Sequence, residues 1–177
     1  MKKTPKLIGL FLILALPVFL FLFLKFFGRN EYTIETFYES GVPTDTLGCE
    51  FEPEAPYRVK LSQQVNGIAL ILLDGGEKLM ATSDRNNIIR RIQQNAPGGV
   101  NLFIYYNKDL GAPIPLEGVF YIPKSEDSWG TLRCLFVTSE DNQLILLDDQ
   151  RKIRGYYGLE LEEVDRLLVE LEILTLL

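Results

Sequence analysis

The run IALILLD, from Ile68 to Asp74, constrains the fold more than any other part of this 177-residue chain. Its residues are apolar on both faces of an extended strand, so both faces need cover from other elements. A strand of this kind is typical of the middle of an α/β sheet, which has helices on its two faces. We therefore expect an α/β fold, and the chain is long enough for one domain with a sizeable core.

Other apolar patterns continue this arrangement along the chain. VNLFIYY (Val100–Tyr106) is the next predicted strand. Between the two strands, isoleucines at helical spacing predict a helix over Ser83–Gln94, which ends before a Pro-Gly-Gly turn. The weaker predicted strands are Tyr57–Leu61, Gly118–Pro123 and a strand around Cys134 in LRCLFV.

The stretch LILLDDQRKIRGYYG, from Leu144 to Gly158, predicts a β-hairpin. Leu144–Leu147 is a second run that is apolar on both faces, and Lys152–Tyr157 alternates as its antiparallel partner. A helix follows over Glu160–Leu174, because leucines recur at helical spacing and glutamates occupy its first turn. Strand, helix, strand, hairpin and helix is the element order of a thioredoxin-like domain. We expect this domain, a central mixed sheet flanked by helices with a C-terminal ββα unit, over residues 57–177.

A second strong feature is the segment LIGLFLILALPVFLFLFL, Leu7–Leu24, which contains no charged residue. A helix of this length rises roughly 27 Å, close to the hydrocarbon thickness of a bilayer. We therefore predict an N-terminal transmembrane helix within residues 1–29, followed by a tether over residues 30–56. A cleaved signal peptide is the alternative, but its apolar region is shorter and no A-x-A-like cleavage site follows here.

The distribution of charge predicts location and partners. Lys2, Lys3 and Lys6 precede the apolar segment, against Lys25 and Arg29 after it, which favours a cytoplasmic N-terminus. We therefore expect a single-pass protein of the cell membrane, with its C-terminal domain extracytoplasmic, on the periplasmic side of the inner membrane. The net charge is −6, and every acidic residue follows the apolar segment. This charge argues against nucleic acid as a partner, since a phosphate backbone requires a basic face.

The last 34 residues, LILLDDQRKIRGYYGLELEEVDRLLVELEILTLL, resemble the end of the SCO/SenC proteins. These are membrane-anchored thioredoxin-fold factors for cytochrome c oxidase assembly. Their last hairpin commonly reads L-V-D-x-x-G-R-I-R-G-Y-Y-D, before a helix that resembles E-E-V-D-R-L. Here Arg151 stands at the usual turn glycine and Gly158 at the usual aspartate. The resemblance implies a thioredoxin-like fold and a protein partner in respiratory-complex assembly.

The residues that form the copper site of this family are missing from the sequence. Active members carry C-x-x-x-C-P after the first long buried strand and a histidine ahead of the final hairpin, a soft ligand set suited to copper. The corresponding segment here, LLDGGEKLMATS (Leu72–Ser83), has no cysteine, and the histidine's place falls near Glu140. The chain contains no histidine at all. We therefore carry over no metal ligand, cofactor or catalytic residue.

Cys49 and Cys134 are the two cysteines, and three interpretations stay open. The favoured one is a buried Cys134 and a free, exposed Cys49. The second is a structural disulfide, which requires the fold to bring the two α-carbons within about 7 Å. The third is a copper site made of two thiolates.

No other catalytic pattern is present in the sequence. No serine lies in a G-x-S-x-G elbow, and Gly75-Gly76 and Gly98-Gly99 lack the surrounding phosphate-loop pattern. We therefore expect a protein without enzyme activity that binds a partner or supports respiratory-complex assembly. The alternatives are a copper or thiol-redox protein that uses Cys49 and Cys134, and an unrelated membrane-anchored interaction domain.

Overall fold

The structure is a computed structural model that describes residues 15–23, 33–62, 65–75 and 82–176. The chain divides into two units, Met1–Thr33 and Ile34–Leu177. In the first unit, residues 15–23 are helical.

The predicted transmembrane anchor is contradicted by this structure. Among the residues just given, no helix is long and apolar enough to cross a membrane. Residues 7–14 and 24 of the predicted segment lie outside the described residues. The predictions of an anchor, of a membrane as partner and of a periplasmic location at the cell membrane are therefore wrong. The predicted fold class is corrected to a mixed α/β domain with a five-stranded mixed sheet.

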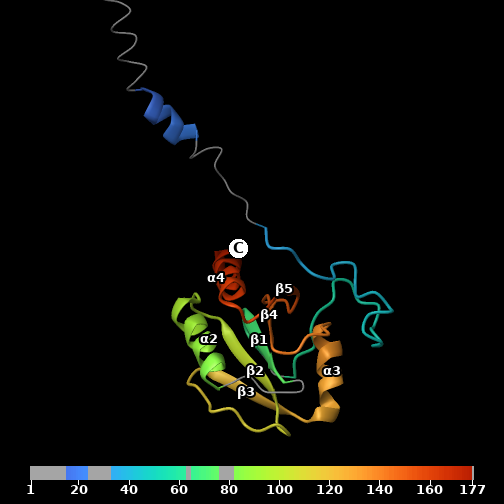
Figure 1. Cartoon of the computed structure of the whole chain (residues 1–177). Helices are drawn as coiled ribbons and strands as arrows, with labels where there is room; N and C mark the ends of the chain where they lie inside the picture. The colour runs from blue at the N-terminus through green and yellow to red at the C-terminus, as the bar shows by residue number, and fades with distance from the viewer. Residues whose placement is uncertain (1–14, 24–32, 63–64, 76–81, 177) are drawn as a thin grey trace, which may run out of the picture. The chain divides into compact units, whose positions relative to one another are not determined.

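The five-stranded sheet forms the centre of the second unit, in the order β3-β2-β1-β4-β5 (Figure 1). The strands are β1 (Ala69–Asp74), β2 (Asn101–Asn107), β3 (Val119–Lys124), β4 (Gln143–Leu147) and β5 (Ile153–Tyr157). β1 pairs in parallel with β2, and β2 with β3. β4 is antiparallel to β1, and β5 is antiparallel to β4. The three strongest apolar runs of the second unit thus form the three adjacent strands β2, β1 and β4.

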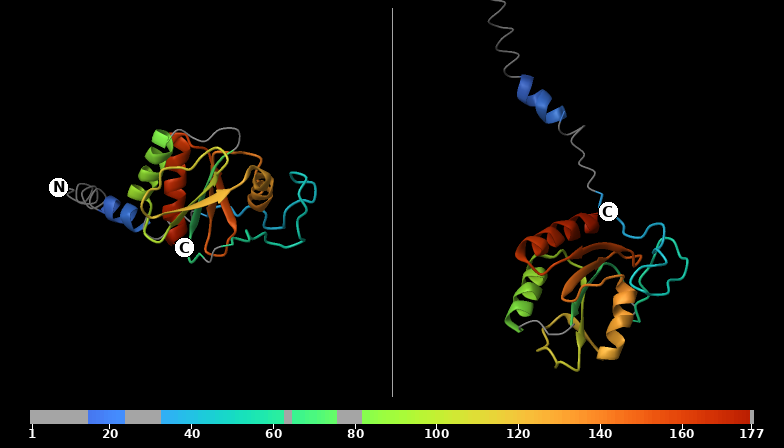
Figure 2. Two further views of the ribbon diagram at one scale, coloured as in Figure 1. Left: turned by 90° about the horizontal axis from the view of Figure 1, so that it is seen from below. Right: turned by 45° about the vertical axis from the view of Figure 1, so that its right-hand side comes forward.

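Helices cover both faces of the sheet, as the apolar runs require. α2 (Thr82–Asn95) and α4 (Leu161–Leu176) lie on one face, and α3 (Glu126–Phe136) lies on the other (Figures 1 and 2). Side chains of β1 alternate between these two layers. Leu70 and Leu72 pack in the cluster with α2 and α4, whereas Ile71 and Leu73 pack in the cluster with α3. Each such buried side chain contributes about 1.5–3 kcal/mol before conformational entropy is counted.

Two of the weaker predicted strands are not strands in the structure. Cys134 lies in α3, because Trp129, Leu132 and Phe136 recur at helical spacing and place one buried face on the sheet. Residues 57–61 belong to no sheet. They run beside the turn that follows β4, where the N–H of Val59 donates to the carbonyl of Arg151 at 3.0 Å.

The segment predicted as a tether packs on the α3 side of the sheet over the part that the structure describes. Phe37, Tyr38 and Phe51 contact the core cluster on this side. The N–H of Phe37 also donates to the carbonyl of Ile153 at 2.9 Å. Since β5 is the last strand in the sheet order, this bond places the segment along an edge of the sheet.

Candidate functional site

The resemblance places a metal site after β1, and at this end of the sheet the structure has the indole ring of Trp129. Gly75 directly follows β1, and a Cβ built on Gly75 would lie 2.0 Å from Cζ2 of Trp129. The indole N–H donates to Asp141 at 2.6 Å, and Arg133 forms an ion pair with the same carboxylate at 2.5 Å. The hydrogen bond from the guanidinium of Arg133 to Asp141 raises the pKa of Arg133. Asp141 follows Glu140, near which the resemblance places the missing histidine. Residues 76–81, which belong to the segment that corresponds to the C-x-x-x-C-P motif, lie outside the described part of the chain.

Asp74, the last residue of β1, forms an ion pair with Arg85 of α2 at 2.6 Å. The two side chains are 0% and 2% exposed. Removing one member of such a pair leaves an uncompensated charge in the interior, which typically costs about 3–5 kcal/mol. The Asp74 carboxylate therefore serves to join α2 to the sheet.

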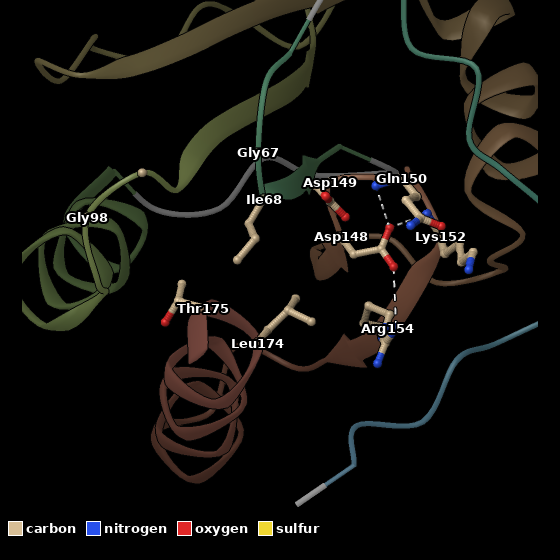
Figure 3. Close-up of a pocket in the computed structure, with 11 residues that line it drawn as sticks. Gly67, Ile68, Gly98, Asp148, Asp149, Gln150, Lys152, Arg154, Leu174 and Thr175 are labelled. Carbon is tan, nitrogen blue, oxygen red and sulfur yellow. Dashed lines mark hydrogen bonds and ion pairs between the residues drawn. The ribbon is translucent and has the colours of Figure 1, made fainter. Parts of the chain in front are cut away.

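A cavity of about 550 Å³ lies at the other end of the sheet, where β1 and β2 begin (Figure 3). We call it the hairpin cavity, because the turn between β4 and β5 forms one side of it. Its lining residues are Gly67, Ile68, Gly98, Gly99, Asp148, Asp149, Gln150, Lys152, Arg154, Leu174 and Thr175. Ile68 and Leu174 supply its apolar area, and both are half-buried. Asp149 and Gln150 are exposed, so polar groups border this apolar centre on the side of the turn (Figure 3).

Asp148 is the buried acid of the hairpin cavity, and the turn uses both of its carboxylate oxygens. One oxygen accepts the backbone N–H groups of Gln150 and Lys152, each at 2.9 Å. The other accepts from the guanidinium of Arg154 at 3.3 Å, as Figure 3 shows. Arg154 also donates to the carbonyl of Ile34 at 2.7 Å, which ties the N-terminal segment of the domain to this turn. Asp148 therefore holds the hairpin in shape.

Cys49 and Cys134 are joined by a disulfide, with their α-carbons 5.8 Å apart, instead of remaining unpaired. A cystine offers no thiolate, which is the form that binds copper. Within the part of the chain that the structure describes, no three or more His, Cys, Asp or Glu side chains are grouped so that they could hold a metal ion.

Tyrosine hydroxyl groups converge on the last turn of α3, a feature that the sequence did not reveal. Tyr57 donates to the carbonyl of Leu135 at 2.9 Å, and Tyr156 donates to that of Phe136 at 2.8 Å. The last carbonyls of a helix lack partners within the helix, so these bonds satisfy them. Burial raises the pKa of both tyrosines. No sequence pattern could have found this cluster, because its members come from distant parts of the chain.

Comparison with known proteins gives no relative: no family model, no curated protein and no solved structure matches this chain. The resemblance of residues 144–177 to the SCO/SenC proteins therefore stays a prediction.

Proposed function

We propose that the domain binds a segment of a protein partner in the hairpin cavity and catalyses no reaction itself. The observation that carries this proposal is the composition of the cavity. Ile68 and Leu174 provide an apolar centre, and the exposed Asp149 and Gln150 stand beside it. An apolar centre within a polar rim is the usual anatomy of a protein interface.

The buried acids of the domain support binding rather than catalysis. A general base must come within hydrogen-bonding reach of its substrate. The carboxylate of Asp148 accepts its hydrogen bonds from the turn and from Arg154, at 2.9–3.3 Å. The carboxylate of Asp74 is buried against Arg85. Both groups stabilise the scaffold around them.

The charges of the hairpin cavity favour an apolar side chain in an extended segment over a charged ligand. Arg154 forms an ion pair with Asp148. The positive charge of Lys152 is matched in number by the negative charge of Asp149, so the lining carries no net charge. Without a net charge of either sign, the cavity has little means to select an ion, and apolar contact supplies the affinity. The resemblance to SCO/SenC proteins suggests which partners to test first, namely components of respiratory-complex assembly.

The proposal can be tested by filling the cavity. Gly98 lines the cavity and no atom lies within 4 Å of a Cβ built on it, so Gly98→Trp adds a bulky side chain at the cavity wall. Gly130 in α3, on the other face of the sheet, has equally open surroundings and provides Gly130→Trp as the matched control. A photo-reactive amino acid at Gln150, which is exposed in the rim, would record the partner in cells of the source organism.

We expect a discrete cross-linked partner that is lost in Gly98→Trp and kept in Gly130→Trp. The partner, identified by mass spectrometry and purified, should then bind the unmodified chain in titration calorimetry, more weakly after Gly98→Trp. Cross-links that are equal in the two variants would show that binding does not use the hairpin cavity.

A further inference from the structure

We propose that Cys49–Cys134 is an exchangeable disulfide, which latches the loop between Tyr38 and Tyr57 onto α3 and which a dithiol reductant opens. The inference is independent of the hairpin cavity. It rests on the base of the loop, on its exposed tip and on a second cavity beside the disulfide.

The base of the loop is closed without help from the disulfide. The N–H of Tyr57 donates to the carbonyl of Tyr38 at 3.0 Å, and the two rings meet edge to face with centroids 6.4 Å apart. The hydroxyl of Tyr57 is bonded to α3, and the nearby Val59 is 2% exposed. These contacts remain when the disulfide opens.

The tip of the loop depends on the disulfide. From Pro43 to Glu50 most residues are exposed, and Cys49 is the one buried residue among them, whereas Phe51 beyond this stretch contacts the core cluster. Its bond to Cys134 is a covalent link between this tip and α3. A segment with few buried apolar contacts belongs to the low-stability end of a protein and opens locally once such a link is cut.

The disulfide can be reached from the surface. A cavity of about 290 Å³ opens between the loop and α3, and we call it the latch cavity. Glu50 and Phe51 lie on its loop side, and Thr131, Cys134 and Leu135 lie on its α3 side. Cys134 thus borders the cavity, whereas Cys49 is 9% exposed. A reductant that enters the latch cavity meets the Cys134 side of the disulfide first.

The exchange proceeds in two balanced steps. A thiolate of the reductant attacks Sγ of Cys134, the bond to Cys49 breaks, and Cys49 leaves as a thiolate that takes up a proton. The second thiol of the reductant then attacks the reductant's own sulfur in the mixed disulfide, which releases Cys134 and closes a disulfide within the reductant. The protein gains two electrons and two protons, and the dithiol loses them.

Treatment of the full chain with dithiothreitol in buffer without denaturant tests the proposal. The readouts are thiol labelling by mass spectrometry, far-ultraviolet circular dichroism, and digestion by a glutamate-specific protease, which can cut after Glu50 and Glu54. We expect both cysteines to become labelled while the dichroism is unchanged. Cleavage in the loop should accelerate by about tenfold or more, because the tip of the loop, once released from α3, can enter the active site of the protease.

Two tryptophan variants in α3 distinguish exchange through the latch cavity from exchange through unfolding. Thr131→Trp fills the latch cavity and should slow the labelling, whereas Gly130→Trp adds the same side chain at the neighbouring position, where space is open. Labelling at equal rates in these two variants would overturn the proposal. Labelling that occurs only together with loss of the dichroism would overturn it as well, since the disulfide would then be reduced only in unfolded molecules.

Discussion

The indole of Trp129 lies directly against the backbone of Gly75, so that a Cβ on Gly75 would lie 2.0 Å from a ring carbon. Trp129 is 2% exposed, and its N–H is bonded to Asp141. The ring therefore has no room to withdraw from a new side chain without giving up this bond. Gly75 and Trp129 together form a packed end to β1.

Gly75→Ala should destabilise the domain, because the added methyl group forces the indole out of place. Overpacking of this kind costs about 1–3 kcal/mol. Urea denaturation followed by tryptophan fluorescence measures the change, since Trp129 is the one tryptophan of the chain. Gly98→Ala is the control, because no atom lies within 4 Å of its new Cβ. Equal midpoints for the two variants would contradict the close packing at Gly75.

The buried pair of Asp74 and Arg85 makes a second prediction. Asp74→Asn and Arg85→Met should each lower the free energy of unfolding by about 3–5 kcal/mol, because each breaks a buried ion pair and keeps the charge of one member in the interior. The double variant should lose much less than the sum of the two single losses, since neither charge then remains. Denaturant titration of all four proteins measures this coupling. Strictly additive losses would mean that the two side chains stabilise the fold independently.

The central strands were predictable, because IALILLD and LILL are apolar on both faces and only the middle of a covered sheet accommodates such strands. The helix α3 was not predictable, because Gly130 interrupts its apolar pattern at helical spacing. The alternation of apolar and polar residues around Cys134 resembles that of a strand. The disulfide between Cys49 and Cys134 was not predictable from the sequence either. These residues are 85 positions apart, and only the packing of the intervening chain brings them together. The transmembrane prediction counted apolar residues, whereas no helix among the residues that the structure describes is long and apolar enough to cross a membrane.

The region of the hairpin cavity was predicted only as a fold element. The β-hairpin over Leu144–Gly158 was expected from its apolar pattern, which assigns no role to Asp148. In the structure Asp148 is 6% exposed, because its carboxylate accepts backbone N–H groups of its own turn. The hairpin cavity joins this turn to the starts of β1 and β2 and to the end of α4, a meeting of segments that no local pattern reveals.

Alkaline pH should destabilise the domain through its buried tyrosines. Burial raises the pKa of Tyr105 to about 12, whereas a tyrosine in the unfolded chain has a pKa of about 10. Burial also raises the pKa of Tyr156 and Tyr157. A pKa that is raised in the folded state gives stability that is complete below the unfolded value, and this stability is lost as the pH rises through the folded value. We therefore expect the urea midpoint to fall from about pH 10 upward.

Tyr105→Phe is the control for the alkaline effect, because it removes the titrating hydroxyl and keeps the ring, which contacts Phe136. Its urea midpoint should fall less steeply between about pH 10 and 12 than that of the unmodified chain. Parallel curves for the two proteins would show that Tyr105 ionises equally in the folded and unfolded states.

Removal of the disulfide should lower stability without abolishing the fold. Replacement of Cys49 and Cys134 by serine releases a covalent link between residues 85 positions apart, which typically costs about 2–4 kcal/mol. The thermal midpoint of the variant should match that of the unmodified chain under reducing conditions. A variant far less stable than the reduced chain would show that the two serines are themselves poorly accommodated.

Leu146 in β4 should be essential for folding, because it lies at the centre of the layer between the sheet and α4. It is 0% exposed and packs in one cluster with Val164, Leu167 and Leu171 of α4. Leu146→Asp places a charge without a partner in this apolar layer. The free energy needed to bury such a charge exceeds the free energy of unfolding of a typical domain. Circular dichroism of the variant should therefore show an unfolded domain.

Leu161→Asp is the matched control, since Leu161 is 63% exposed and begins α4, where the helix dipole favours a negative charge. Its stability should stay within about 0.5 kcal/mol of the unmodified chain. A folded Leu146→Asp variant would contradict the packing of α4 on the final hairpin.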